Sequence, residues 1–305
     1  MTKVFIDGNS GTTGLRIHER LSERKDIEII TLPDEIRKDA GARKEALNSS
    51  DIAFLCLPDA AAIEAVALAK NPETCIIDTS TAHRTSPGWT YGFPELKGQR
   101  EKIAASKRIA NPGCHASGFI ALVAPLVQAG IIPADAALSA YSLTGYSGGG
   151  KKMIAQYESD EPDILLSAPG MYGLTQQHKH LPEMVSICGL ENAPVFCPVV
   201  APYYSGMQVT VPLFSSQIKG TAGNIKEIYR SYYTDGLVRY EETEGAFLYA
   251  GEFSGRDDMK ITVCGNEDRI LLVSVFDNLG KGASGAAIQN MNTVIGVDGK
   301  TGLVF

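Results

Sequence analysis

The start of the chain constrains the fold more than any other segment, because a short apolar run, a glycine-rich turn and a helical segment follow one another there. Residues 3–6 (KVFI) are typical of a buried strand. The segment TGLRIHERLSER would place Leu15, Ile17 and Leu21 on one side of a helix. The turn between strand and helix carries Gly8, Gly11 and Gly14. This order predicts the first unit of an α/β fold.

The same alternation recurs through the first third of the chain. Strand-like runs at 27–31, 52–58 and 75–78 are separated by helical segments at 42–48 and 59–69. Strands that alternate with helices in this way are joined by crossovers and lie parallel in one sheet. The sequence therefore predicts a Rossmann-like, doubly wound parallel sheet.

The pattern changes after residue 135, where longer strand-like stretches predominate. They occur at 137–147, 193–200, 206–214, 259–265 and 269–278, with helices expected near 175–187 and 222–236. We expect an α+β domain with a mainly antiparallel sheet. A last helix at about 283–295 follows a glycine-rich turn and is expected to return to the first domain.

Bulk properties exclude several classes of protein. A chain of 305 residues fits two domains, and its net charge of -7 argues against nucleic acid or an anionic membrane as the main partner. No charged leader and no run of roughly 20 apolar residues is present. The six cysteines form no CxxC pair and no zinc-like spacing, so we expect reduced thiols, no metal and a cytoplasmic location.

The glycine-rich turn has the spacing G-x-x-G-x-x-G and the setting of a dinucleotide site. Missing side chains let the backbone approach a pyrophosphate, and the helix N-terminus then donates amides to it. The alternative is a tight turn without a ligand. We expect cofactor contacts from the whole turn, namely Gly8, Asn9, Ser10, Gly11, Thr12, Thr13 and Gly14.

The segment after the second strand bears on the choice between NAD and NADP. No acidic residue stands at the strand end, where an acceptor for the NAD ribose would lie. Arg37 and Lys38 could receive a 2′-phosphate, although Asp34 and Glu35 make a solvated charged loop an equal alternative. The sequence favours NADP.

Cys114 differs from the other five cysteines, which lie in or beside apolar runs as core residues do. It follows Asn-Pro-Gly and precedes HASGFIALVAPLVQAG, which places its sulfur near a helix N-terminus. That position stabilises a thiolate, and nearby amides could hold an oxyanion. The alternative is a cysteine that only caps the helix. The sequence favours a nucleophile.

A nucleophilic cysteine needs an acid/base partner, and the chain has five histidines. His18 lies on an exposed-looking helix and His83 in a loop, while His115 is expected to point away from Cys114. His178 and His180 could fold across to the thiol. Their spacing of two would prevent both from sharing one helical face, so at most one should be in line, and two solvated histidines remain the alternative.

Several motifs together resemble the N-acetyl-γ-glutamyl-phosphate reductase family of arginine biosynthesis, in its shorter form, which is related to aspartate-semialdehyde dehydrogenases. They are GNSGTTG at 8–14, DTSTAHR at 78–84, YGFPEL at 91–96, NPGC at 111–114, TGYSGGGK at 144–151, HKHLPE at 178–183 and DNLGKGASGAAIQNMN at 277–292. The longer form of the family usually has an aromatic residue where this chain has His115. Finer contacts should therefore not be transferred between the two forms.

The resemblance implies roles for individual residues. Cys114 would be the acylated nucleophile and His180 the acid/base, and further cofactor contacts would come from Asn278, Gly280, Lys281 and Gly282. Arg84 would bind an anion, or else only cap a strand end. We expect substrate contacts from Arg84, Asn111, Ser147 and His178. Residues 1–114 and 282–305 would form the NADP-binding domain, and residues 115–281 the substrate and oligomerisation domain.

The implied activity is NADPH-dependent reduction of N-acetyl-γ-glutamyl phosphate to the semialdehyde through a cysteine thioacyl intermediate, in a homodimer or homotetramer. Three alternatives stay open. One is a reductase of another acyl phosphate, of the β-aspartyl or α-aminoadipyl type. Another is a non-catalytic dinucleotide sensor, which would not need the NPGC loop. The last is a cysteine hydrolase, which would leave the glycine-rich turn without a role.

Overall fold

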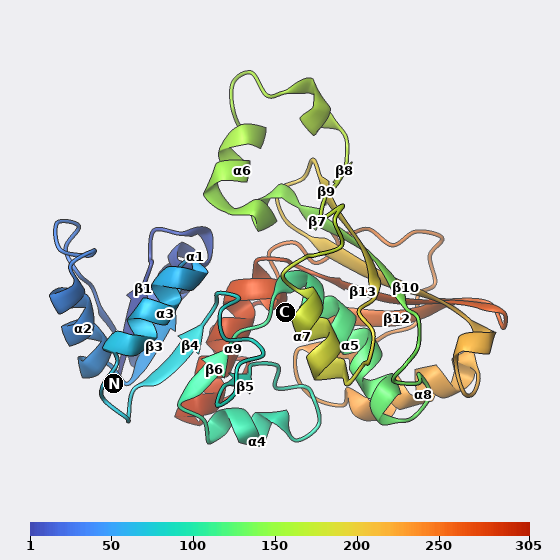
Figure 1. The fold of residues 1–305 in the computed structure, drawn as a ribbon, viewed down its shortest axis with the longest axis horizontal. Helices are drawn as coiled ribbons and strands as arrows, with labels where there is room; N and C mark the ends of the chain where they lie inside the picture. The colour runs from blue at the N-terminus through green and yellow to red at the C-terminus, as the bar shows by residue number, and fades with distance from the viewer. The chain divides into compact units, whose positions relative to one another are not determined.

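Short apolar strands, most of them followed by a helix, build the first of two units in the computed structural model, which describes residues 1–305. Unit 1 contains residues 1–94, 98–112 and 283–303, and unit 2 contains residues 95–97, 113–282 and 304–305. Figure 1 follows the chain from the N-terminus through both units.

Unit 1 is a six-stranded sheet in which every pair of neighbouring strands is parallel. The strands are β1 (Thr2–Asp7), β2 (Ile27–Ile30), β3 (Ile52–Leu55), β4 (Cys75–Asp78), β5 (Thr90–Tyr91) and β6 (Arg108–Ala110). Their order is β2-β1-β3-β4-β6-β5, so the chain reverses its direction of travel across the sheet after β2. The predicted doubly wound parallel sheet is confirmed.

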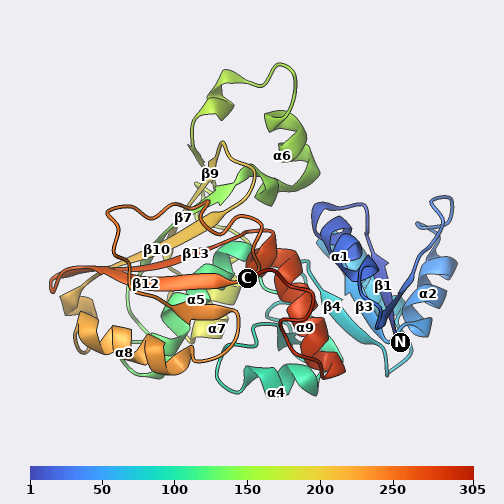
Figure 2. The same ribbon diagram turned by 180° about the vertical axis from the view of Figure 1, so that it is seen from behind.

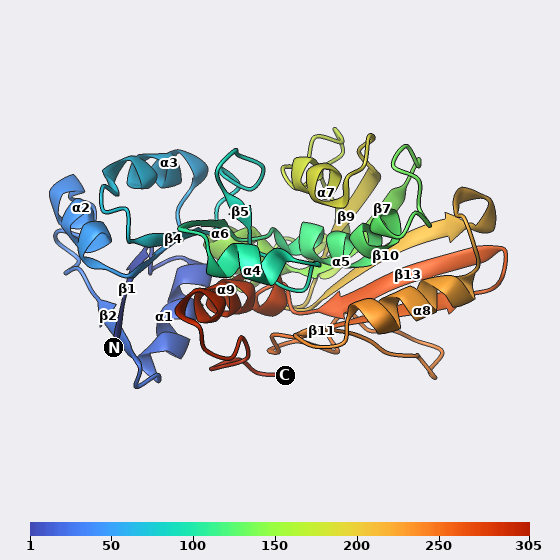
Figure 3. The same ribbon diagram turned by 90° about the horizontal axis from the view of Figure 1, so that it is seen from below.

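Helices cover both faces of this sheet. They are α1 (Thr12–Ser22), α2 (Ala40–Ser49), α3 (Asp59–Leu68), α4 (Gln99–Ala104) and α9 (Gly285–Ile295). Val4 and Ile6 of β1 pack in a core with residues of α1, α4 and α9, whereas Phe5 between them packs in a second core with residues of α2 and α3. The period of two along a strand thus fills both cores. Figure 3 shows α2 and α3 on one side of the sheet and α1 and α9 on the other.

Unit 2 is built on a seven-stranded sheet of order β11-β12-β13-β10-β7-β9-β8. Its strands are β7 (Ser139–Gly145), β8 (Gly170–Met171), β9 (Val195–Ala201), β10 (Met207–Phe214), β11 (Val238–Tyr240), β12 (Met259–Gly265) and β13 (Arg269–Phe276). The sheet is mainly antiparallel, as predicted, but the pairs β7–β9 and β11–β12 are parallel. Long connections run between the members of each parallel pair, which is the requirement for parallel pairing.

The helices of unit 2 are α5 (Cys114–Gln128), α6 (Gly150–Tyr157), α7 (Leu181–Cys188) and α8 (Ala222–Tyr232). Helix α5 is apolar on all sides and is buried almost throughout, because it packs against β10, β13, α7 and α8. The opposite face of the sheet carries exposed Tyr141 and Leu271. Figure 2 shows the strands β12, β13, β10 and β7 from behind. We call this surface the open face.

The sequence did not predict two short helices, α4 and α6. No helix in the structure combines the length and the apolar character needed to cross a bilayer.

Candidate active site

The glycine-rich turn leads from β1 into α1, and two of its glycines are required by the backbone. Gly8 has a φ of +91°, and a Cβ there would overlap the carbonyl oxygen of Cys56. A Cβ on Gly14 would overlap the carbonyl oxygen of Gly8, so α1 can begin this close to the strand only with glycine. The N-terminus of α1 is capped by Gly11, with no side chain bonded to its amides. These amides are available to an anion.

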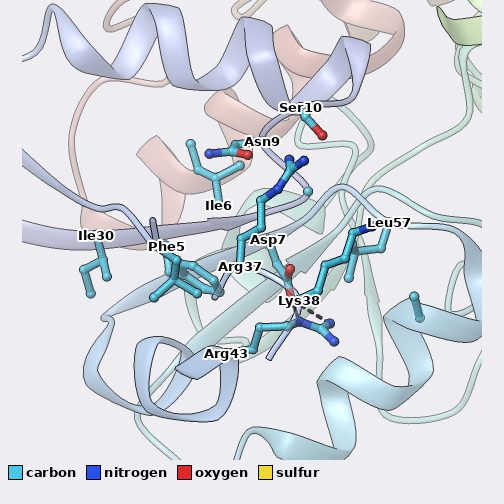
Figure 4. A pocket seen from close by; sticks show the side chains of 13 residues that line it. Phe5, Ile6, Asp7, Asn9, Ser10, Ile30, Arg37, Lys38, Arg43 and Leu57 are labelled. Atoms are coloured by element: carbon cyan, nitrogen blue, oxygen red, sulfur yellow. Dashed lines mark hydrogen bonds and ion pairs between the residues drawn. The ribbon is translucent and has the colours of Figure 1, made fainter. Parts of the chain in front are cut away.

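A pocket of about 410 Å³ lies beside this turn, entirely within unit 1. Its wall combines Gly8, Asn9 and Ser10 of the turn with Arg37, Lys38 and Arg43 from the segment after β2. In Figure 4 the guanidinium of Arg37 points toward Asn9 and Ser10. The pocket thus joins a helix N-terminus to cationic side chains, the donor set that suits a phosphorylated dinucleotide.

The three cations of the pocket are not equivalent. Arg43 donates from Nε and Nη2 to Oδ2 of Asp7, at 3.0 and 2.8 Å. Burial raises the pKa of the Asp7 carboxyl, and the bonds from Arg43 partly offset that rise. Arg37 has only a distant ion pair of 3.4 Å with exposed Asp34, and Lys38 is exposed. Arg37 and Lys38 are therefore better placed than Arg43 to bind a further phosphate group.

Two expected substrate residues, Arg84 and Asn111, lie together in unit 1. Nε of Arg84 donates to the carbonyl oxygen of Asn111 at 3.0 Å, and Nη2 donates to that of Thr79 at 3.2 Å. The Asn111 side chain is buried, donates to the carbonyl oxygen of Ala283 and accepts from Asn290. Both side chains thus fasten the loop ends of β4 and β6, and their contact with substrate remains a prediction.

Cys114 is the first residue of α5, in agreement with the sequence interpretation. The preceding Gly113 donates its backbone N–H to Oε2 of buried Glu183 at 3.1 Å, which fixes the loop before the helix. Gly282 packs directly against Cys114, since a Cβ on this glycine would lie 2.9 Å from that of the cysteine. The thiol is only partly buried and stands in the field of the α5 amides.

The interpretation of the other five cysteines as core residues holds for some of them. Cys75 and Cys188 are buried, whereas Cys56, Cys197 and Cys264 are partly buried. Burial raises the pKa of Cys56 and of Cys75 to about 12, and it also raises that of Cys188. These three thiols stay protonated at neutral pH.

Three histidine rings gather in unit 2. The rings of His178 and His180 have centroids 4.7 Å apart, and each ring lies 5.5 Å from that of His115. The argument from one helical face does not apply, because neither His178 nor His180 lies inside a helix: His180 is the N-cap of α7, and His178 lies in the loop before it. The backbone N–H of His180 donates to Nδ1 of His178 at 3.1 Å.

His115 does not point away into an unrelated part of the core. Its Nδ1 lies 2.6 Å from Oγ of Ser142 and its Nε2 lies 2.6 Å from the hydroxyl of Tyr172. Burial, with the charges of His178 and Lys179 adding to it, lowers the pKa of His115 to about 3. This ring is neutral at physiological pH, so it is not a general acid there. His180, buried at the start of α7, is the better match to the expected acid/base.

The segment predicted to contact cofactor near residue 280 also lies in unit 2. Nδ2 of Asn278 donates to Oγ of Ser147 at 3.0 Å, and its Oδ1 accepts from the Gly206 amide at 2.9 Å. Nζ of Lys281 is buried against both carboxylate oxygens of Glu95, at 2.8 and 2.7 Å. Any ligand contact by Lys281 would therefore come from its backbone.

Sequence reasoning missed Tyr172 and Glu183, and it set His115 aside. Glu183 had a readable signal, because an acidic residue in the first turn after Pro182 is typical of a helix start. Tyr172 and the burial of His115 had none in a single sequence. No group of three or more His, Cys, Asp or Glu side chains is arranged to hold a metal ion.

Comparison with known families gives two matches in succession along the chain. Residues 3–106 match the family described as semialdehyde dehydrogenase, NAD binding domain. Residues 114–278 match the family described as semialdehyde dehydrogenase, dimerisation domain. Unit 1 is thus a nicotinamide dinucleotide-binding fold.

Curated relatives are similar over nearly their whole length. A protein of Brucella ovis named N-acetyl-gamma-glutamyl-phosphate reductase is 48% identical over 306 residues, covering 96% of this chain and 99% of the relative. A protein of Brucella suis with the same name is 47% identical over the same shares.

Solved structures share the fold at low identity. A probable aspartate-semialdehyde dehydrogenase from Pseudomonas aeruginosa has a TM-score of 0.73 and 16% identity, covering 96% of this chain and 98% of the other. Aspartate semialdehyde dehydrogenase with NADP from Candida albicans has a TM-score of 0.68 and 14% identity, covering 96% and 99%. These likenesses confirm the predicted fold, and the relatives at close to half identity extend the match to sequence. The chain belongs to the N-acetyl-γ-glutamyl-phosphate reductase family within the semialdehyde dehydrogenases.

Proposed function

We propose that this chain reduces N-acetyl-γ-glutamyl phosphate to N-acetylglutamate 5-semialdehyde and phosphate with NADPH, as a step of arginine biosynthesis. The names of the relatives supply the substrate. The observation that carries the chemistry is Cys114 as first residue of an apolar helix, held by Glu183 through Gly113 and lying in one unit with His180. A nucleophile without a dinucleotide site would suit a hydrolase, but the pocket of unit 1 makes that reading unnecessary.

The reaction begins at Sγ of Cys114. The imidazole of His180 removes the thiol proton, and the α5 amides stabilise the thiolate. The thiolate attacks the carbonyl carbon of the acyl phosphate, and phosphate leaves to give a thioester on Cys114. The same amides hydrogen-bond the oxyanion that develops during attack.

The thioester is then reduced and released. When bound, the reduced nicotinamide supplies the hydride that brings the thioester carbon to the aldehyde level. Release of the aldehyde returns the electron pair of the C–S bond to Sγ of Cys114, and His180 returns the proton. Gly282 lies so close to Cys114 that a side chain there would overlap the cysteine. We therefore include the segment Asn278–Gly282 in the proposed nicotinamide site.

The preference for NADP rests on the cations of the unit 1 pocket. We propose that Arg37 and Lys38 bind the 2′-phosphate and that Arg43 keeps its pair with Asp7. The roles of Arg84, Asn111, Ser147 and His178 in substrate binding and of the turn Gly8–Gly14 in cofactor binding are part of the same proposal. So is the division into an NADP-binding domain (1–114 and 282–305) and a substrate domain (115–281).

We also propose a homo-oligomer of cytoplasmic location, with the open face of unit 2 as the contact between copies. The match of residues 114–278 to a dimerisation domain supports this, as do exposed Tyr141 and Leu271 on that face. Sedimentation velocity distinguishes a dimer, a tetramer and a monomer directly.

The reverse reaction tests the proposed function. Purified protein is given NADP, phosphate and N-acetylglutamate semialdehyde, and NADPH absorbance is followed, with aspartate semialdehyde in a parallel sample. NADPH formation that depends on phosphate and on the acetylated aldehyde supports the proposal. Turnover of aspartate semialdehyde alone would move the assignment to a β-aspartyl substrate. If protein that binds NADP forms no NADPH with either aldehyde, a dinucleotide sensor would be favoured.

A further inference from the structure

His115, the residue after the nucleophile, has no part in the mechanism above, yet it is among the most tightly held side chains of unit 2. It is 3% exposed. Both ring nitrogens make short hydrogen bonds, Nδ1 with Ser142 on β7 and Nε2 with Tyr172 after β8, each of 2.6 Å. Phe196 packs edge-on against the ring at 5.3 Å. The three polar groups form one chain from the sheet to the hydroxyl of Tyr172.

The charge state of the His115 ring limits which of its nitrogens can donate a hydrogen bond and which can accept one. Burial, with His178 and Lys179 adding to it, lowers the pKa of His115 to about 3, so the ring carries a single N–H at neutral pH. One ring nitrogen therefore donates and the other accepts. The hydrogen bonds that join Ser142, His115 and Tyr172 therefore run in one of two directions.

Ser142 decides between them. It is fully buried, and its hydroxyl has one hydrogen-bond partner, Nδ1 of His115. If Ser142 donates to Nδ1, its proton is satisfied and the ring proton sits on Nε2. If Nδ1 donates to Ser142, the hydroxyl proton of Ser142 is left in the core without an acceptor, which carries the full desolvation cost of a buried donor. In the first direction the proton left over belongs to Tyr172, which is only partly buried and can donate it to water or substrate, so this direction is the stable one.

We propose that His115 is a positioning residue that holds Tyr172 as a hydrogen-bond donor to the substrate oxygen at Cys114. Nε2–H of His115 donates to the hydroxyl oxygen of Tyr172, so the hydroxyl proton of Tyr172 is directed elsewhere. This inference rests on the proposed function for the identity of the substrate, but the direction of the hydrogen bonds through His115 does not depend on it.

The contacts of Tyr172 lie beside the nucleophile in the fold. Its hydroxyl is 2.6 Å from Nε2 of His115, the residue that follows Cys114 in α5. Burial raises the pKa of the Tyr172 hydroxyl, and the negative charge of a Cys114 thiolate adds to the rise. The Tyr172 ring also lies 5.8 Å from that of His178, in the cluster that contains His180. An acyl carbon bonded to Sγ carries its oxygen one bond away, and this oxygen gains charge in each chemical step.

Tyr172 keeps its own proton throughout. Because its pKa is raised, the phenol donates a hydrogen bond and does not transfer a proton, which remains the task of His180. The group thus adds a side-chain donor to the backbone amides at the start of α5. A chain of neutral donors is suited to this task because it adds no charge beside the thiolate.

The tautomer of His115 is measured directly by nitrogen NMR on protein labelled with ¹⁵N in its histidine rings. His115→Gln identifies the signals by their loss. We expect Nε2 protonated and Nδ1 unprotonated at neutral pH. A proton on Nδ1, or an imidazolium, would overturn the proposal. This measurement needs no turnover, so it stands whether or not the proposed reaction is found.

The catalytic consequence is measured by a double-mutant cycle in the reverse assay. Tyr172→Phe should lower kcat by about 10²-fold, the effect of losing one oxyanion donor. Ser142→Ala removes the donor that fixes the ring proton on Nε2, so that part of the protein has Nε2 accepting the proton of Tyr172, and kcat should fall about tenfold with KM for NADP unchanged. In the Tyr172→Phe background, Ser142→Ala should have no further effect on kcat.

Ser142→Thr is the matched control, because it keeps the hydroxyl in the same strand. It should restore most of the kcat lost in Ser142→Ala. Equal losses of kcat in Ser142→Ala and Ser142→Thr, or additive losses in the double-mutant cycle, would show that Ser142 acts through packing. Either result would refute the proposed role of the hydrogen bonds through His115. Circular dichroism and thermal unfolding of each variant identify any that has not folded. If the wild-type protein reduces no acyl phosphate, the proposed function fails, and the NMR result still decides the direction of the chain.

Discussion

Replacing Arg37 and Lys38 by alanine tests which dinucleotide the chain prefers. Both side chains line the unit 1 pocket, and the Arg37 side chain is 38% exposed. A hydrogen bond to a charged group contributes about 1.5–3 kcal/mol when protected, and exposure to water lowers this to about 1–2 kcal/mol. Each substitution should then raise the Kd for NADPH by about 5- to 30-fold.

The comparison with NADH isolates the phosphate. NADH lacks the 2′-phosphate, so its Kd should change by less than about threefold in either variant. The double substitution should raise the Kd for NADPH by about 100-fold, since two separate cations each contact one dianionic group. Fluorescence titration of the reduced dinucleotides measures all of these constants without turnover.

Lys70→Ala provides the control for net charge. Lys70 is exposed at the end of the α3 region and does not line the pocket, so its loss changes the overall charge equally without removing a contact. Its Kd for NADPH should stay within about twofold at 0.1 M salt, where screening acts over about 10 Å. Equal losses of NADPH and NADH in the Arg37 and Lys38 variants would refute the phosphate assignment. So would an unchanged Kd for NADPH.

Three further outcomes are expected. Cys114→Ser should abolish turnover and leave the Kd for NADPH unchanged, and near-normal turnover would remove the nucleophile assignment. Lys281→Met should lower the free energy of unfolding, measured by urea titration, by about 3–5 kcal/mol, because it leaves the Glu95 carboxylate buried without this cation. Adding Glu95→Gln to this variant should recover part of the loss. Folding lowers the pKa of His115 from 6.5 to about 3, so between these pH values the unfolded chain binds a proton that the folded protein does not. The stability that this residue contributes is therefore complete above pH 6.5 and is lost as the pH falls toward 3. His115→Gln should flatten that part of the stability profile, and an unchanged slope would contradict the burial argument.

The parts of this protein that follow local rules could be predicted from the sequence. The apolar runs of β1, β3 and β4 and the alanine-rich segment of α3 appear where their periodicity places them. Cys114 at the start of α5 was readable because Pro-Gly cannot continue a strand and an apolar run of helical length follows. These signals act within a few residues, so one sequence contains them.

The helical-face argument for His178 and His180 assumed that the helix begins before His180, although one signal placed its start later. Pro182 stands in the first turn of α7, a position that proline favours because its missing N–H is not needed there. Helix α7 therefore begins after His180, and the helical-face argument for His178 and His180 does not apply. Reading Pro182 as a helix start would have corrected it.

Other features could not be read from one sequence. The parallel pairing of β7 with β9 depends on where the long connection through α6, β8 and α7 returns to the sheet. The burial of His115 depends on Ser142, Tyr172 and Phe196, which are remote in sequence and are brought together by that same return. Long-range packing decides both.

The surroundings of Cys114 combine two demands that oppose each other. The loop and the glycine beside it must be rigid, and buried carboxylates supply that rigidity: Glu183 holds the Gly113 amide, while Asp277 accepts from the amides of Gly255 and Leu279 and so fixes the segment that ends at Gly282. A bare negative charge near the sulfur would disfavour the thiolate. Hydrogen bonds from backbone N–H groups disperse the charge of each carboxylate at its own site. The field of the α5 amides can then act on Sγ, and the neutral His115 and Tyr172 complete the site without adding charge of either sign.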